Sequence, residues 1–138
     1  MNMLKKLMIT SVLFASFSSF AEISVIVNSA NTDQINAKLI KRIYLGKIKA
    51  FPNGKKIKVL TLKDGTPETE VFRQSALKKS NSQFKSYWSK LAFTGKGTPP
   101  KEVNSAADMI NAVKADASAI GFIDSAAVTG DVKVVAKF

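Results

Sequence analysis

The sequence predicts an α/β fold, because strand-like apolar runs alternate with amphipathic helical segments. Residues 22–28, EISVIVN, form a nearly continuous apolar run, which is typical of a strand buried on both faces of a sheet. Residues 57–62 and 119–123 are two further strand candidates. The first strand is followed by an amphipathic helical segment, so we expect these two elements to begin a βαβ unit.

The first 21 residues have the features of a secretory signal peptide. Lys5 and Lys6 precede an apolar run at 7–17, and Ser-Phe-Ala at 19–21 is a small-x-small cleavage site. An uncleaved membrane anchor is the alternative, but the apolar run is shorter than the ~20 residues that span a bilayer. We therefore expect a secreted protein with a single domain at 22–138 and no transmembrane segment after cleavage.

Composition narrows the function classes. The chain has 21 basic and 10 acidic residues, and without the two lysines of the leader the net charge is +9. It has no His and no Cys, so it lacks a His base, a Cys nucleophile and a His/Cys metal cluster. No Walker, GxSxG or GxGxxG motif occurs. We expect neither enzyme activity nor a metal or cofactor, and a hydrolase is disfavoured on the same grounds.

The segment after the first strand predicts a helix followed by a basic loop. Residues 31–33 are expected to provide its turn and cap, and Gly46 is expected to end it. Apolar residues recur at helical spacing at Ile35, Leu39, Ile40 and Ile43. The loop at 46–56 belongs to a stretch with nine bases and no acid. It is either a patch for an anionic partner or a solvated surface. Nucleic acid is not expected, because aromatic residues are few there and no nucleic-acid motif occurs.

The central stretch, 57–72, is predicted to be strand, tight loop and helix. Asp64 and Gly65 break the strand. Thr66 is a suitable N-cap, and Pro67 suits the first helical position because its missing N–H is not needed there. A loop that opens a helix offers unpaired N–H groups to an anion.

Charge around this loop leaves two interpretations open. Lys63 and Arg73 favour an anion, whereas Glu68 and Glu70 in the first helical turn oppose it. The alternative is an ordinary strand-to-helix connection.

The second half of the mature chain contains two further helix signals. Ser80 and Gln83 match a capping box, and Ser105 can cap a helix with Asp108 at its third position. The first helix carries an aromatic and apolar stripe, either core or a ligand face, at Phe84, Tyr87, Trp88 and Leu91. The second carries a stripe expected to be buried, at Met109, Ile110 and Val113.

Three remaining segments complete the expectations. The loop at 94–101, TGKGTPPK, is either one lip of a pocket that carries Lys96 or a plain connection. Gly121 is expected where another element packs closely against the strand at 119–123. Residues 132–136 are expected to form an edge strand.

Taken together, these motifs resemble the phosphate-binding branch of the type 2 periplasmic substrate-binding proteins, and most closely its short, single-unit members. The run Ile43 to Ile48, IYLGKI, resembles the family's IFLGKI segment, and an aromatic residue, Pro52 and Gly54 follow as in its W-x-x-G turn. Asp64-Gly65-Thr66 resembles the start of the family's phosphate loop, DGSGT. The other matching segments are Val27-Asn28, Phe72, Tyr87-Trp88, residues 93–97, Pro100 and residues 119–122, AIGF.

The resemblance implies a three-layer α/β/α sandwich like one lobe of such a receptor. It implies a periplasmic, non-catalytic module for phosphate or a similar oxyanion that serves an ABC transporter in the membrane. The implied ligand residues are Asn28, Ser29, Lys63, Asp64, Gly65, Thr66 and Lys96.

The chain departs from the family motif at three positions. Pro67 and Glu68 replace a Gly and a Thr, and Leu62 stands where an Arg is expected. The longer N-terminal part that supplies half of the family's anion cage has no counterpart in this sequence. These departures motivate a second hypothesis, a cell-envelope interaction or scaffold protein that kept the fold and lost the ligand.

Overall fold

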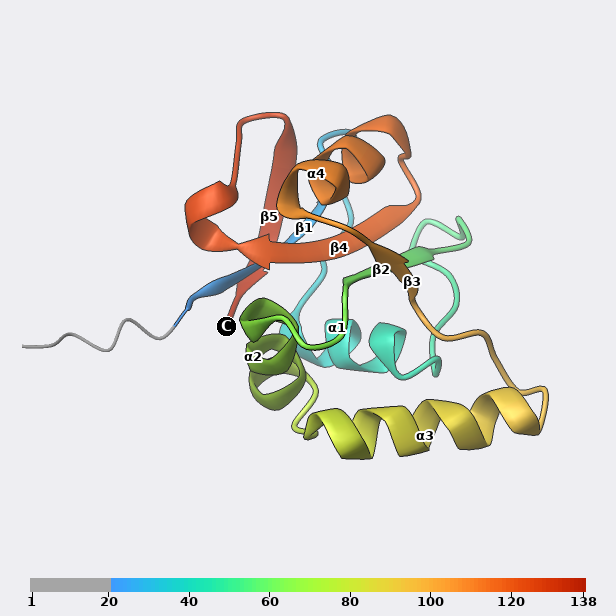
Figure 1. Ribbon diagram of the computed structural model, residues 1–138. Helices are drawn as coiled ribbons and strands as arrows, with labels where there is room; N and C mark the ends of the chain where they lie inside the picture. The colour runs from blue at the N-terminus through green and yellow to red at the C-terminus, as the bar shows by residue number, and fades with distance from the viewer. Residues whose placement is uncertain (1–20) are drawn as a thin grey trace, which may run out of the picture.

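The computed structural model describes residues 21–138, and these residues contain five strands, four α-helices and one short 3-10 turn (Figure 1). The strands are β1 (Ile23–Asn28), β2 (Lys58–Leu62), β3 (Lys101–Val103), β4 (Ala119–Asp124) and β5 (Val132–Lys137). The helices are α1 (Ala37–Tyr44), α2 (Pro67–Ala76), α3 (Asn81–Phe93) and α4 (Ala106–Ala115), and the 3-10 turn is η1 (Ser125–Ala127). Apart from Ala21, the predicted signal peptide lies outside the described residues and stays a prediction.

The strands form one mixed sheet in the order β3-β2-β4-β1-β5. β2 pairs in parallel with β3 and β4, whereas β1 pairs antiparallel with β4 and β5. The prediction of a βαβ unit starting at β1 is therefore wrong, because β1 runs opposite to β2 and is separated from it by β4. Parallel crossovers occur later in the chain, from β2 through α2 and α3 to β3, and from β3 through α4 to β4. The strand expected at the sheet edge, β5, lies there.

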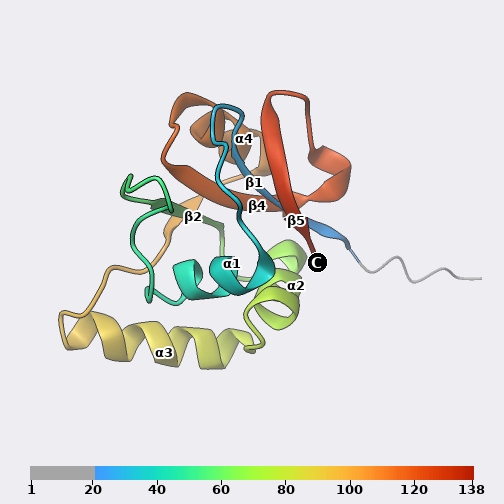
Figure 2. The same cartoon turned by 180° about the vertical axis from the view of Figure 1, so that it is seen from behind.

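Helices cover both faces of the sheet, as predicted for a three-layer α/β/α sandwich. α4 packs on one face against β1, β2 and β4, and α2 packs on the other face against the same strands. Figures 1 and 2 show α1 and α3 on the same side as α2, with α3 as the outermost helix. The residues of β1 from Ile23 to Val27 are all buried, as expected for a strand covered on both faces.

Each face of β4 contributes differently to the core. On the α2 side, the Phe122 ring stacks on Phe72 at 4.0 Å between centroids, and Tyr44 meets Phe72 edge-on at 4.7 Å. On the α4 side, a Cβ at Gly121 would overlap the Sδ atom of Met109. The close approach predicted at Gly121 is thus confirmed, and Met109 is the side chain that requires it.

Local capping signals mostly match the structure. Thr66, Ser80 with Gln83, and Ser105 cap α2, α3 and α4 as predicted. The cap of α1 was placed too early, because Asn36 caps it and residues 31–33 form a preceding turn closed by the Asn31 side chain. No residue pattern indicated β3, a three-residue edge strand with largely exposed side chains.

Candidate functional site

The loop from Lys63 to Thr66 lies where β2 ends and α2 begins, at the carboxyl end of a parallel strand. In open α/β sheets this is the usual position for a ligand. Gly65 adopts a φ of 83°, which lets the chain turn tightly into the helix. The loop therefore has the placement that an anion site at a helix N-terminus requires.

The Thr66 hydroxyl is engaged in the cap itself. Its Oγ1 atom accepts from the backbone N–H of Thr69 at 3.3 Å and lies 2.7 Å from the Thr69 Oγ1 atom. Both hydroxyls also approach the carbonyl oxygen of Lys63, at 3.2 Å and 2.8 Å. Thr66 is thus a structural cap first, and an anion would have to share its hydroxyl with this network.

A charged cluster stands directly beside the loop. Arg73, on α2, is 3% exposed, and its Nη2 atom donates to the Asp64 carboxylate at 2.6 Å. Its Nη1 atom donates to Asn81 at 3.1 Å, and the guanidinium lies 4.1 Å from the centre of the Phe84 ring. Lys85 approaches the other Asp64 oxygen at 3.5 Å from α3. The Asp64 carboxylate therefore contacts two cationic side chains, and one of them, Arg73, is buried.

This environment shifts the titration of Asp64. Partial burial alone would raise the pKa of its carboxyl group, but the hydrogen bond and charge of Arg73, with a smaller contribution from Lys85, outweigh burial and lower it. Asp64 is therefore ionised at neutral pH, and its negative charge occupies the position beside Arg73 that an oxyanion could otherwise take.

A hollow of about 500 Å³ adjoins the pair, and Asp64, Arg73, Lys85, Thr61 and Glu102 are among the residues that line it. Its two acids offset its two bases. Without a change at Asp64, this hollow gives an anion little net attraction.

The seven predicted ligand residues do not converge on one site. Asn28 is the last residue of β1, and Ser29 follows it. The end of β1 pairs with the start of β4, which lies beside the start of β2. The side-chain amide of Asn28 donates to the carbonyls of Val113 and Lys114 at the end of α4, at 3.0 and 2.9 Å. Asn28 and Ser29 thus lie at the end of the sheet opposite the loop at 63–66, and Asn28 serves as a link to α4.

Lys96 is also separated from the loop at 63–66. Asp64 is connected through Arg73 to the first residue of α3, whereas Lys96 follows the last turn of that helix. A helix of 13 residues is about 20 Å long. Lys96 instead meets the basic loop after α1, where the Lys49 Nζ atom donates to its carbonyl at 3.4 Å.

The structure thereby joins two segments that sequence reasoning treated separately. The basic loop at 46–56 and the loop at 94–101 line one pocket of about 560 Å³ together with Trp88. Of the two interpretations of the 94–101 loop, the pocket lip is the one that the geometry favours. Phe84 and Trp88 are 6% and 5% exposed, and Tyr87 and Leu91 pack against the core, so the aromatic and apolar stripe belongs to the core. Trp88 also lines this pocket. No sequence signal linked the two loops, because they are about fifty residues apart.

The described residues contain no group of three or more His, Cys, Asp or Glu side chains placed to hold a metal ion. None of the helices among residues 21–138 is long and apolar enough to cross a bilayer.

Comparisons with known proteins identify the fold. An ABC-type phosphate transport receptor from Vibrio cholerae matches with a TM-score of 0.65 and 22% identity, over 84% of this chain and 46% of the receptor. A phosphate ABC transporter substrate-binding protein from Clostridium perfringens, solved with bound phosphate, matches with a TM-score of 0.66 and 21% identity, over 84% and 45%. PstS from Borrelia burgdorferi matches with a TM-score of 0.61 and 13% identity, over 84% and 47%.

The chain therefore shares its α/β fold with part of these substrate-binding proteins, as the sequence motifs predicted. The chain spans less than half the length of these proteins. No protein-family model and no curated protein sequence matches it.

Proposed function

We propose that this chain is a non-catalytic, periplasmic solute-binding module for phosphate or a similar oxyanion, and that it serves an ABC transporter. The observation that carries the proposal is its fold, which matches receptors for phosphate over 84% of the chain. The net positive charge of the mature part supports the same ligand class. This chain covers less than half of each receptor, and we propose that a second lobe or a second copy would complete the anion site.

The proposed anion contacts are at the start of α2. The backbone of Gly65 and Thr66 would face the anion, the Thr66 hydroxyl would share its cap bond, and the exposed Lys63 side chain would add charge. Pro67 at the first helical position removes one N–H donor from this set.

One observation favours a second candidate, an envelope interaction or scaffold protein that binds no anion. Asp64 already neutralises Arg73 at 2.6 Å, and Glu68 adds negative charge in the first turn of α2. The Asp64 carboxylate would then permanently take the place of the anion, and the fold would be retained for protein contacts.

Calorimetric titration with phosphate and then sulfate separates the two candidates. Thr66→Asp is the informative variant, because Asp is as good an N-cap as Thr but places a negative charge at the proposed site. Ser105→Asp makes a comparable change at the cap of α4 and is the matched control.

The solute-binding proposal expects one-site phosphate binding that Thr66→Asp weakens by at least about tenfold, equivalent to about 1.4 kcal/mol. Ser105→Asp should leave it unchanged. Absence of saturable heat, or weak heat that added salt removes equally from all three proteins, would refute solute binding and favour the interaction protein.

A further inference from the structure

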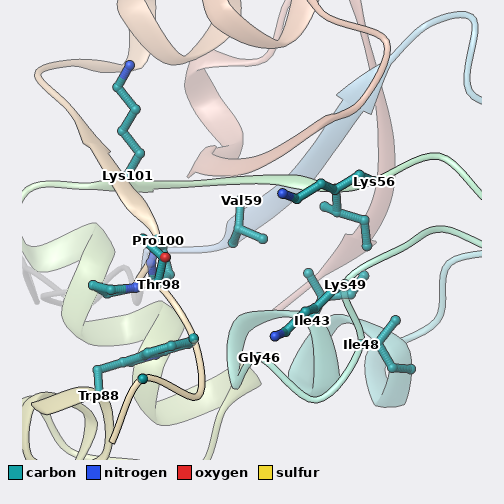
Figure 3. Close-up of a pocket in the computed structure, with 14 residues that line it drawn as sticks. Ile43, Gly46, Ile48, Lys49, Lys56, Val59, Trp88, Thr98, Pro100 and Lys101 are labelled. Carbon is teal, nitrogen blue, oxygen red and sulfur yellow. The ribbon is translucent and has the colours of Figure 1, made fainter. Parts of the chain in front are cut away.

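A pocket of about 560 Å³ lies at the end of the sheet where β2 begins, away from the loop at 63–66. A short hairpin forms one wall: the Ile57 N–H donates to the Lys49 carbonyl at 2.9 Å, and Ala50 pairs with Lys56. The end of α1 and the loop after α3 form the other walls (Figure 3). None of the residues proposed for oxyanion binding at the start of α2 lines it.

The floor of this pocket is apolar and rigid. It includes Ile43, Val59 and Trp88, which come from α1, β2 and α3. The indole Nε1 atom donates to the carbonyl of Tyr44 at 3.2 Å, which holds the ring in place. A Cβ at Gly46 would lie 2.7 Å from the ring, so the chain after α1 packs directly on the indole.

Lysines at the rim give the pocket a positive charge. Lys49, Lys56 and Lys101 belong to its lining, and no acidic residue does. In Figure 3 the side chains of Lys49 and Lys56 extend towards the space beside Val59 and Gly46, whereas Lys101 extends away from it. The Lys49 ammonium also donates to the Lys96 carbonyl at 3.4 Å, which places this charge between the two loops.

We propose that this pocket binds a small amphiphilic anion, a molecule with one carboxylate head and an apolar body. The head would pair with the ammonium groups of Lys49 and Lys56, and the body would lie on Trp88 and Val59. Inorganic phosphate has no apolar body and would make no apolar contact with this floor, so it is not the ligand of this pocket. A volume of this size is typical of small-molecule sites.

The single tryptophan of the chain makes the proposal directly measurable. Trp88 lies in the pocket floor, so its fluorescence should change when a ligand covers it. Decanoate, used below the concentration at which it forms micelles, supplies the head and the body. Acetate supplies the head alone, and decanol supplies a body of the same length without the charge.

We expect decanoate to change the Trp88 fluorescence saturably with one site per chain, and acetate to give no saturable change. Decanol should bind at least about tenfold more weakly, since it cannot pair with the lysines. The double variant Lys49→Ala/Lys56→Ala should weaken the binding of decanoate by a similar factor. Lys38→Ala/Lys114→Ala removes two lysines outside the pocket, so it controls for net charge and should leave binding unchanged.

A second variant tests the cavity itself. Thr98 is exposed at the rim, so Thr98→Phe should fill the mouth and abolish decanoate binding without harming the fold. Equal loss of binding in the two lysine double variants, or full binding in Thr98→Phe, would overturn the assignment. Absence of any saturable change with decanoate would overturn it as well.

The result is independent of the oxyanion proposal. Thr66→Asp should leave decanoate binding unchanged, and Thr98→Phe should leave phosphate binding unchanged. If Thr66→Asp weakened decanoate binding as much as Lys49→Ala/Lys56→Ala does, decanoate would be binding outside this pocket and the inference would fail.

Discussion

Asp64→Asn should destabilise the fold because it removes the anionic partner of a buried cation. The Arg73 side chain is 4% exposed and donates to Asp64 at 2.6 Å and to Asn81 at 3.1 Å. A buried guanidinium without its carboxylate retains most of its desolvation cost. The Asn81 contact and the stacking on Phe84 remain in the variant, so the loss is partial.

The magnitude follows from the exposure of the two partners. Breaking a fully buried pair costs about 3–5 kcal/mol. The Asp64 side chain is 40% exposed, so water screens the pair and can replace part of the contact. The asparagine also keeps one oxygen acceptor, so we expect a loss of about 1–2 kcal/mol at neutral pH. Lys85 adds little, because its side chain is 59% exposed.

The stability difference between wild type and Asp64→Asn should depend on pH, because it comes from the charge of Asp64. Arg73 and Lys85 together outweigh the effect of burial and lower the pKa of Asp64 below its usual value. A group with a lowered pKa in the folded state stabilises the protein above its unfolded pKa, about 3.9, and loses this contribution as the pH falls through the folded pKa. Protonated aspartic acid resembles asparagine. The difference between wild type and Asp64→Asn should therefore be constant from about pH 5 to 8 and shrink below about pH 4.

Urea unfolding at low ionic strength, followed by circular dichroism at several pH values, measures this difference. The control is Asp116→Asn, which removes the same charge from an exposed pair with Lys58 at 4.0 Å and should cost less than about 0.5 kcal/mol. If Asp64→Asn cost no more than the control, or if its cost stayed the same at pH 3, the charge argument would be refuted.

The same variant bears on the two candidate functions. If the chain binds phosphate beside the loop, removing the competing carboxylate next to Arg73 should tighten binding even though the fold becomes less stable. If the Asp64–Arg73 pair permanently replaces an anion, the wild type should not bind phosphate at neutral pH, and binding should appear only in Asp64→Asn, where Arg73 has lost its carboxylate. Calorimetry on Asp64→Asn thus complements the titration of Thr66→Asp.

Three further predictions concern the core and the surface. Gly121→Ala should cost about 1–3 kcal/mol in urea unfolding, because the new methyl group overlaps the Met109 side chain; equal stability would mean that Met109 moves aside freely. Tyr44→Phe should cost about 1–2 kcal/mol by removing the buried 2.7 Å hydrogen bond to the Leu60 carbonyl, and an unchanged urea midpoint would contradict this. Phe93→Ser should change the thermal stability by less than about 0.5 kcal/mol, because the ring is 94% exposed, so a larger loss would reveal a partner for this ring.

Local signals in the sequence predicted most of the elements correctly. The caps at Thr66, Ser80 and Ser105 depend on side chains that bond a backbone group three residues away, so the sequence alone contains the whole interaction. The buried character of β1 and β4 was equally readable from their continuous apolar runs. Gly121 was recognised because an isolated glycine in a strand usually marks a close approach.

The errors concern features that only long-range contacts decide. The direction of β1 depends on its pairing with β4, about one hundred residues later, so the sequence around β1 gives no indication of it. β3 has three residues with no alternating pattern, and its pairing with β2 is what makes it a strand. The predicted grouping of Asn28 with Thr66 required β1 and β2 to be parallel. Since they are antiparallel, these residues lie at opposite ends of the sheet.

This topology also separates the two candidate sites energetically. β2 begins beside the pocket lined by Lys49, Lys56 and Trp88 and ends at the loop at 63–66. Its five residues span about 16 Å at 3.3 Å each. That distance exceeds the Debye length of about 10 Å at 0.1 M salt, so charges at one site are largely screened from the other. Substitutions at Lys49 and Thr66 should therefore act additively. Any coupling between the two ligands would have to come from a shift of β2 or α3, the two elements that reach both sites.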